Sequence, residues 1–166
     1  PKRNLSRICC KLEEIFATVF RQVVLTRFGQ SQHEARRKHG ELHSEAINEL
    51  WADANSKLFS DSIIITDDYR CWWVYIPHFI HSPFYCYAYS FGEFLVLALY
   101  NMYLTEGRSF VPRYIELLSS GGSEAPDSLL EKVGVDIKDK EFWQSGLDLL
   151  AGMLSEAKQQ ATEAGY

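Results

Sequence analysis

Apolar positions along this chain repeat at intervals of three and four residues, which is the spacing of one face of an α-helix. The clearest stripe, near the N-terminus, consists of Leu5, Ile8, Leu12, Ile15, Phe16, Val19, Phe20 and Val23. Polar side chains fill the opposite side, so the pattern predicts an amphipathic helix of about 25 residues that ends near Gly29. In the polar stretch that follows, Gln30 to Gly40, Glu34 and Lys38 are spaced to pair on a short helix.

Two further stretches predict helices in the middle of the chain. Ser44 is a suitable N-cap for the first, and Pro83 after Ser82 favours the start of the second, which continues to about Glu106. The second is apolar or aromatic almost throughout, which is typical of a helix buried on most sides. The expected core positions of the first are Ile47, Leu50, Trp51, Ala54 and Leu58.

The C-terminal part of the chain contains helical patterns separated by glycines. Gly121 and Gly122 end one helix, Gly134 ends a short helix that begins at Pro126, and Asp139 caps the last. The apolar positions of the first and last of these helices are Val111, Tyr114, Ile115 and Leu118, and Phe142, Leu147, Leu150 and Leu154. After these positions the chain becomes a polar tail, which is expected to fray.

The predicted fold class is all-α. One brief β-branched run, Ile63–Ile65, predicts at most one very short extended segment. The chain has 166 residues, which suits a single helical domain over residues 1–166. The longest apolar run, Phe94–Leu99, is far shorter than the roughly 18 residues needed to span a bilayer.

The net charge indicates which kinds of partner the chain can bind, and the cysteines indicate the cellular compartment. The formal charge of -5 argues against nucleic-acid binding, because the nearest thing to a basic patch is Arg36–Lys38, expected to be a solvated turn. The four cysteines have irregular spacing and no CxxC, which predicts reduced, mostly buried thiols in a cytoplasmic protein. Neither nucleic acid nor a membrane is expected as a partner.

Three histidines invite a test for a metal site. A zinc-binding HExxH places two histidines four residues apart on one helical face, with a glutamate beside the first. His33 and Glu34 begin such a motif, but His39 follows six residues after His33, a helical rotation of about 240° that separates the two rings. His39 and His43 are four apart but flank Gly40, which indicates a loop. No metal ligand is therefore predicted.

His78 and His81 lie in a loop directly ahead of the predicted buried helix, and Tyr85, Tyr87 and Tyr89 follow at once. Phenols and a histidine at a helix N-terminus form a set of hydrogen-bond donors that can face a developing oxyanion. The alternative is a packed core, with the histidines bonded to loop carbonyls. On a helix, Tyr85 and Tyr89 share one face and Tyr87 lies on another, so the three phenols are not expected to address one group.

The strings WVYIPHF (Trp73–Phe79) and PFYCYAY (Pro83–Tyr89) resemble the distal substrate-binding segment of oligoendopeptidase F. The resemblance to the C-terminal part of that family extends over essentially the whole chain. Strings in the same order elsewhere are FRQV at Phe20, GELH at Gly40, LW at Leu50, GGSEAP at Gly121 and DKEFWQSGL over Asp139–Leu147. Where many relatives carry an acidic residue after the pair matching Arg27 and Phe28, this chain has Gly29.

The resemblance implies a helical portion of a zincin-like metallopeptidase that hydrolyses oligopeptides in the cytoplasm. In that family zinc is held by the histidines of HExxH and a later glutamate, none of which is present here, so the ligands are expected upstream of Pro1. The resemblance assigns substrate binding to His78 and transition-state stabilisation to Tyr87, with Tyr85 as the neighbouring candidate. His81 is the alternative to His78, because the segment before Phe84 is longer than in some relatives.

The expected partners are an oligopeptide substrate and the N-terminal catalytic part of the same protein. Without that part, this chain is expected to be inactive and to self-associate through apolar surface that has lost its cover. The alternative is a non-catalytic helical module that binds a peptide or a protein without cleaving it.

Overall fold

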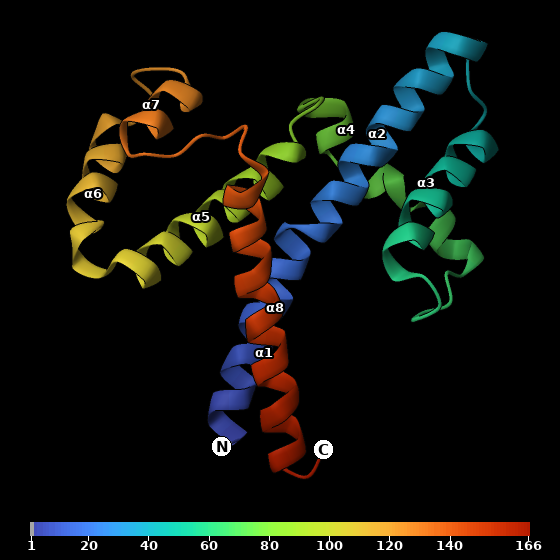
Figure 1. The fold of residues 1–166 in the computed structure, drawn as a ribbon. Coiled ribbons are helices and arrows are strands. Elements are labelled where there is room, and N and C mark those ends of the chain that lie inside the picture. The colour runs from blue at the N-terminus through green and yellow to red at the C-terminus, as the bar shows by residue number, and fades with distance from the viewer. Residues whose placement is uncertain (1) are drawn as a thin grey trace. The chain divides into compact units, whose positions relative to one another are not determined.

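The computed structural model describes residues 2–166, and the regular elements in this range are all helical (Figure 1). The α-helices are α1 (Lys2–Thr18), α2 (Phe20–His39), α3 (Ser44–Phe59), α4 (His78–His81), α5 (Tyr87–Glu106), α6 (Val111–Ser120), α7 (Pro126–Lys132) and α8 (Lys140–Glu163). Two 3₁₀ helices are η1 (Asp67–Tyr75) and η2 (Gly107–Ser109). Ile63–Ile65 is irregular, and the all-α prediction is confirmed.

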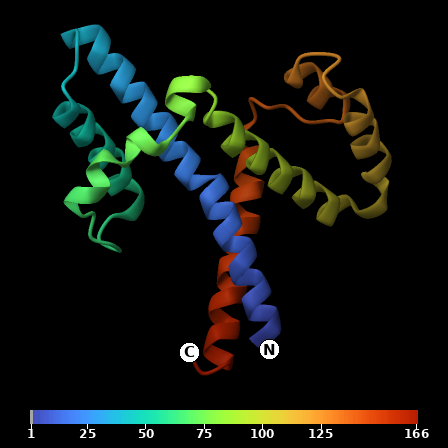
Figure 2. The same ribbon diagram turned by 180° about the vertical axis from the view of Figure 1, so that it is seen from behind.

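The chain divides into two compact units. One comprises residues 14–91 and is called here the α2–α3 unit; the other combines the residues up to 13 with residues 92–166 and is called the α6–α8 unit. Both views of the fold show α3 running alongside α2 within the first unit (Figures 1 and 2).

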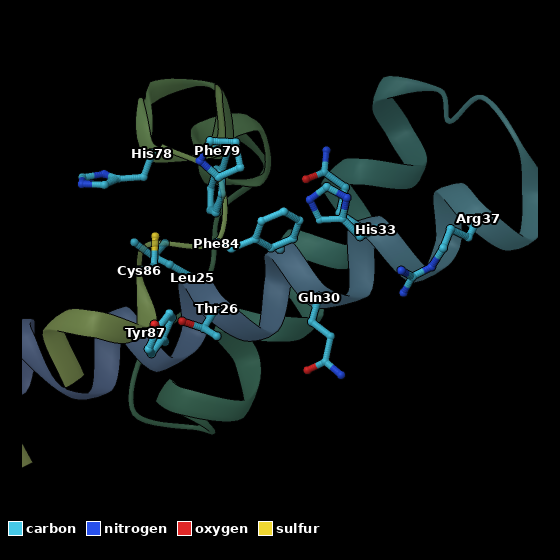
Figure 3. A pocket seen from close by; sticks show the side chains of 13 residues that line it. Leu25, Thr26, Gln30, His33, Arg37, His78, Phe79, Phe84, Cys86 and Tyr87 are labelled. Atoms are coloured by element: carbon cyan, nitrogen blue, oxygen red, sulfur yellow. The ribbon is translucent and has the colours of Figure 1, made fainter. Parts of the chain in front are cut away.

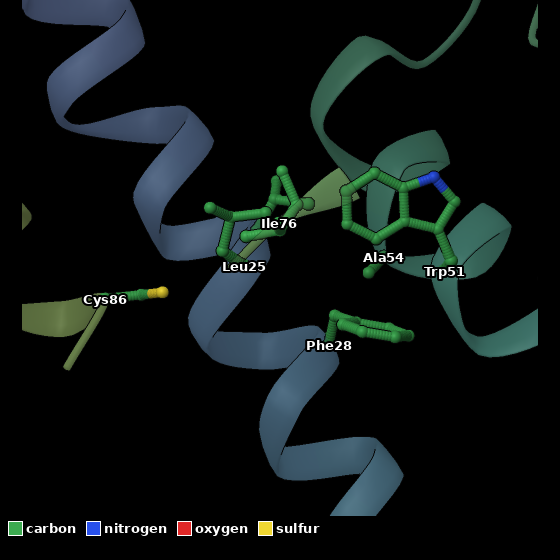
Figure 4. Packing of buried hydrophobic residues seen from close by; sticks show 7 residues of the cluster. Leu25, Phe28, Trp51, Ala54, Ile76 and Cys86 are labelled. Atoms are coloured by element: carbon green, nitrogen blue, oxygen red, sulfur yellow. The ribbon is translucent and has the colours of Figure 1, made fainter. Parts of the chain in front are cut away.

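The core of the α2–α3 unit is formed by side chains from four segments that are distant in sequence (Figure 4). Phe28 of α2 packs edge-on against Trp51 of α3, with ring centroids 5.2 Å apart. The indole Nε1 of Trp51 donates a 2.9 Å hydrogen bond to the carbonyl of Tyr69, so burial of this side chain leaves no unpaired donor. Trp51 and Ala54 are buried as predicted, and the partly buried residues around them are Ile47, Leu50, Leu58, Tyr69, Trp73 and Phe79.

The predicted end of the first helix at Gly29 is wrong. The helix pauses at Val19 and then continues through Gly29 to His39. Interior glycine costs a helix only about 1 kcal/mol, which tertiary packing of the neighbouring Leu25 and Phe28 offsets. Arg36–Lys38, which was expected to form a solvated turn, lies instead in the last helical turn of α2. Basic side chains are favourable there because the C-terminal end of the helix dipole is negative.

The start of α5 also differs from the prediction. The helix begins at Tyr87, and the preceding Phe84 has a backbone φ of 64°, a left-handed conformation that interrupts a right-handed helix. This turn allows Cys86 to enter the core of the α2–α3 unit. Ser44 was expected to be the N-cap of α3, but it is the first residue of that helix. Its hydroxyl donates a hydrogen bond to the carboxylate of Glu45.

The α6–α8 unit has its own core, formed by Leu99, Phe110, Leu130, Val133 and Val135. The predicted signals around its helices are confirmed: Gly121 and Gly134 have φ of 52° and 84°, and Asp139 accepts a 2.9 Å hydrogen bond from the backbone of Glu141. Contrary to the expected fraying, α8 continues to Glu163. The prediction of a helix buried on most sides fails for α5, since Val96 is 54% exposed.

The expectation of mostly buried thiols is wrong. Cys9, Cys10 and Cys71 are exposed, and only Cys86 is buried; all four are free. Desolvation raises the pKa of the Cys86 thiol above its ordinary value. Among the helices of residues 2–166, none combines the length and apolar character that a bilayer span requires.

A close approach between α5 and α8 in the α6–α8 unit yields a stability prediction. A Cβ added at Gly146 would lie 3.1 Å from the backbone nitrogen of Ala98 and 3.3 Å from the carbonyl oxygen of Phe94. Backbone atoms cannot move aside as a flexible side chain can. At Gly152 of the same helix, an added Cβ meets nothing within 4 Å.

We therefore expect Gly146→Ala to have a free energy of unfolding about 1–3 kcal/mol lower than Gly152→Ala. Both substitutions improve helix propensity equally, so the difference isolates the steric conflict at Gly146. Urea unfolding of the two variants measures it, and equal midpoints and slopes would show that α8 does not pack this closely on α5.

Candidate functional site

A pocket of about 320 Å³ opens in the α2–α3 unit (Figure 3). One face of α2 forms its first wall, with side chains at the helical spacing of three and four residues: Leu25, Thr26, Gly29, Gln30, Gln32, His33 and Arg37. The second wall comes from α4, the turn after it and the first residue of α5: His78, Phe79, Pro83, Phe84, Cys86 and Tyr87. None of these described lining residues is acidic.

Two phenylalanines give the second wall of the pocket an aromatic surface. Phe79 packs edge-on against the buried Phe28, with centroids 5.0 Å apart, and so ties the second wall to the core. Phe84 lies against the ring of His33, with centroids 4.8 Å apart, although 74% of Phe84 is exposed. A phenylalanine with positive φ and such exposure is strained, and strain of this kind is concentrated at ligand-binding sites.

His78 is held by a tyrosine. Its Nε2 lies 3.1 Å from the phenol oxygen of Tyr89, and the two rings meet edge to face with centroids 5.7 Å apart. Tyr89 also contacts Tyr85 edge to face, at 5.3 Å. Tyr85 and Tyr89 are thus in contact, but not through the predicted shared helical face, because Tyr85 precedes α5.

Tyr87 occupies a different position from the other two phenols. It is the first residue of α5, lines the pocket together with His78, and is 59% exposed. Its backbone lies at the N-terminus of a 20-residue helix, which is the positive end of the helix dipole. Of the predicted site residues, the structure therefore brings His78 and Tyr87 to one cavity.

Tyr85 and His81 lie outside that lining. Tyr85 is 51% exposed and faces His78 with its ring nearly parallel, at a centroid distance of 6.3 Å. His81 is exposed at the end of α4. This placement favours His78 over His81 as the histidine that meets a ligand in the pocket.

The histidines tested for metal binding are not gathered. His33 lies mid-helix in α2, His39 ends that helix and His43 precedes α3. Across residues 2–166, no set of three His, Cys, Asp or Glu side chains comes together in a way that could hold a metal ion. The side chains described here therefore do not fit a catalytic zinc.

A sequence model described as Peptidase family M3 matches residues 1–149. The chain belongs to peptidase family M3. The resemblance inferred from WVYIPHF and PFYCYAY is thereby confirmed, and these strings contain the residues of the second wall of the pocket.

Relatives within the M3 family are similar along most of this chain. It is 32% identical over 165 residues to oligopeptidase PepF of Bacillus subtilis (strain 168), covering 95% of this chain and 24% of the relative. It is 28% identical over 148 residues to the plasmid oligoendopeptidase F of Lactococcus lactis subsp. cremoris, covering 89% and 24%. The chain thus spans about a quarter of the length of the curated relatives it matches.

Two solved structures share the fold of this M3 segment. A putative peptidase from Chlamydophila abortus has a TM-score of 0.82 at 26% identity, covering 92% of this chain and 25% of its own. The oligoendopeptidase-F from Enterococcus faecium has a TM-score of 0.89 at 23% identity, covering 98% and 31%. At that identity the second likeness shows the fold alone.

His33 and Arg37 are among the pocket residues of the M3 segment that were not predicted as site residues. Tyr89 was named among the candidate phenols, but its contact with His78 was not predicted. The spacing of Leu25, Gly29, His33 and Arg37 was a usable signal, since each step is four residues. It was lost because the helix was predicted to end at Gly29.

Proposed function

We propose that this chain is the substrate-binding part of a cytoplasmic zinc metalloendopeptidase that hydrolyses oligopeptides, as one helical domain of a larger protein. The observation that carries the proposal is that His78 and Tyr87 line one pocket in a chain of family M3. The names of relatives, oligopeptidase and oligoendopeptidase, support a short peptide as the substrate.

Tyr87 is proposed to donate a hydrogen bond to the oxyanion that forms when the scissile carbonyl becomes tetrahedral. A phenol carries one O–H donor, and the exposure of Tyr87 leaves its hydroxyl accessible to a peptide in the pocket. The adjacent helix N-terminus favours negative charge in the same place. A donor aimed at charge that develops during the reaction accelerates the chemical step and not merely binding.

His78 is proposed to hold the peptide backbone. In the tautomer whose Nε2 accepts a hydrogen bond from the Tyr89 hydroxyl, Nδ1 carries the proton and can donate to a peptide carbonyl. Tyr89 then acts as a positioning residue, because it fixes both the tautomer and the orientation of the ring. The ring of Tyr85 packs against Tyr89 and so limits the orientations that the Tyr89 side chain can adopt.

Zinc supplies the activated water in the proposed enzyme, and its ligands are assigned to another part of the protein. The side chains described here bring no such set of ligands together. The contribution of this chain is confined to binding the peptide, orienting the carbonyl and stabilising the oxyanion.

The test compares this chain with the full-length protein on a quenched fluorescent oligopeptide. We expect the full-length protein to cleave it, to lose activity with a chelator and to regain activity with zinc, whereas this chain alone shows no cleavage. A full-length protein that holds zinc but leaves the peptide intact would contradict the proposal, as would zinc-dependent cleavage by this chain alone. Peptide binding without cleavage by the full-length protein would establish the non-catalytic alternative.

A further inference from the structure

The pocket lining extends along α2. Tyr87, the proposed oxyanion donor, lies at one end of this lining, and the cationic side chain of Arg37 lies at the other. Figure 3 shows Tyr87 close to Thr26, whereas Arg37 lies at the opposite end, beyond Phe84 and His33. Thr26 and Arg37 belong to the same helix and are eleven residues apart in sequence. At the rise of an α-helix, this separation is about 16 Å along the axis.

Arg37 has the charge properties of an anion-binding group. None of the described residues that line the pocket is acidic, and the ion pairs found within residues 3–166 do not include Arg37. His33 and Gln30, one and two turns before Arg37 on the same helix, add further polar atoms along the path to Tyr87.

The helix dipole offers a competing explanation for a basic residue here. Arg36, Arg37, Lys38 and His39 all lie in the last turn of α2, where positive charge is favourable irrespective of any ligand. The dipole does not distinguish Arg37 from Arg36. The pocket does, because Arg37 lines it and Arg36 does not.

We propose that Arg37 is a carboxylate anchor, which binds a carboxylate of the peptide substrate about five residues from the bond presented to Tyr87. An extended peptide advances about 3.3 Å per residue, so roughly five residues cover the distance from Thr26 to Arg37. The guanidinium binds carboxylates through paired N–H donors. This inference rests on the proposed function and adds to it a chemical basis for the selection of short peptides.

The intervening apolar surface fits the same occupant. Phe79 and Phe84 lie between the two ends and can cover apolar side chains of an extended peptide. Since side chains of an extended chain alternate in direction, only every second one meets this surface. The carboxylate is either the C-terminus or an Asp or Glu side chain at the same distance.

Binding to the 166-residue chain tests the anchor without requiring cleavage. Fluorescence anisotropy is measured with a heptapeptide that carries an uncharged N-terminal fluorophore, as the free acid and as the C-terminal amide. We expect the free acid to bind about three- to ten-fold more tightly, and the advantage to fall at high salt. Arg37→Gln abolishes the advantage, whereas Arg36→Gln, an equal change in charge on the adjacent residue, retains it.

A third peptide identifies the source of the carboxylate. An amidated heptapeptide ending in Glu regains the affinity if a side-chain carboxylate serves, and its loss in Arg37→Gln supports the anchor in that form. Equal binding of acid, amide and Glu-amide peptides overturns the anchor, as does an equal effect of Arg36→Gln and Arg37→Gln. If the full-length protein nevertheless hydrolyses oligopeptides, the proposed function stands while the anchor fails.

Discussion

Replacement of Tyr87 by phenylalanine in the full-length protein will lower kcat for an oligopeptide by about 100- to 1000-fold. The substitution removes one oxygen and leaves the ring, so the second wall of the pocket keeps its shape. The loss falls on kcat more than on KM because the phenol is proposed to bind an oxyanion that the ground-state substrate lacks. Zinc content should not change, since no metal ligand is assigned to this chain.

Two other tyrosine substitutions make this result specific. Tyr75→Phe removes a phenol that is 76% exposed and outside the pocket, and kcat should stay within about two-fold of the wild type. Tyr85→Phe tests the neighbouring candidate. If Tyr85→Phe caused the large loss and Tyr87→Phe did not, the oxyanion role would pass to Tyr85.

Replacement of His78 by alanine will lower kcat/KM by about two- to ten-fold, mainly through KM. The imidazole is proposed to contribute one hydrogen bond to the peptide backbone, and such a bond is worth about 0.5–1.5 kcal/mol. Tyr89→Phe leaves the ring contact with His78 but removes the phenol oxygen 3.1 Å from Nε2. It should raise KM less than His78→Ala does, and add little in the double variant, because Tyr89 acts through His78.

His81→Ala is the comparison that decides between the two histidines. His81 is exposed and outside the pocket lining, so its removal should leave KM unchanged. A rise in KM with His81→Ala, accompanied by no change with His78→Ala, would reverse the assignment.

Helix caps, glycines and the spacing of apolar residues correctly predicted those features that depend on residues close together in the sequence. Asp139 caps α8, Gly134 follows α7 with positive φ, and Trp51 and Ala54 are buried on the predicted face of α3. Each of these features arises from a side chain and its near neighbours in sequence. For that reason the all-α fold class followed from the pattern of residues, whereas α4, η1 and η2 did not.

The pocket was not predicted because it depends on where α2 ends and where α5 begins, and the sequence pattern predicted both positions incorrectly. Gly29 is a helix-ending signal in isolation, but packing of Leu25 and Phe28 continues α2 to His39 and brings Arg37 to the pocket wall. Ser82 and Pro83 are helix-starting signals, but the turn at Phe84 delays α5 until Tyr87. In both places contacts between residues far apart in the chain outweigh the local preference.

The decisive measurement is nuclear magnetic resonance of the isotopically labelled 166-residue chain during titration with an oligopeptide. We expect saturable shifts to concentrate on the pocket, including the backbone amides of His33, Phe84 and Tyr87, and to be smaller elsewhere. Saturable shifts confined to residues outside this pocket, or none at millimolar peptide, would contradict the proposed function, because the chain would then not bind substrate in the pocket that His78 and Tyr87 line.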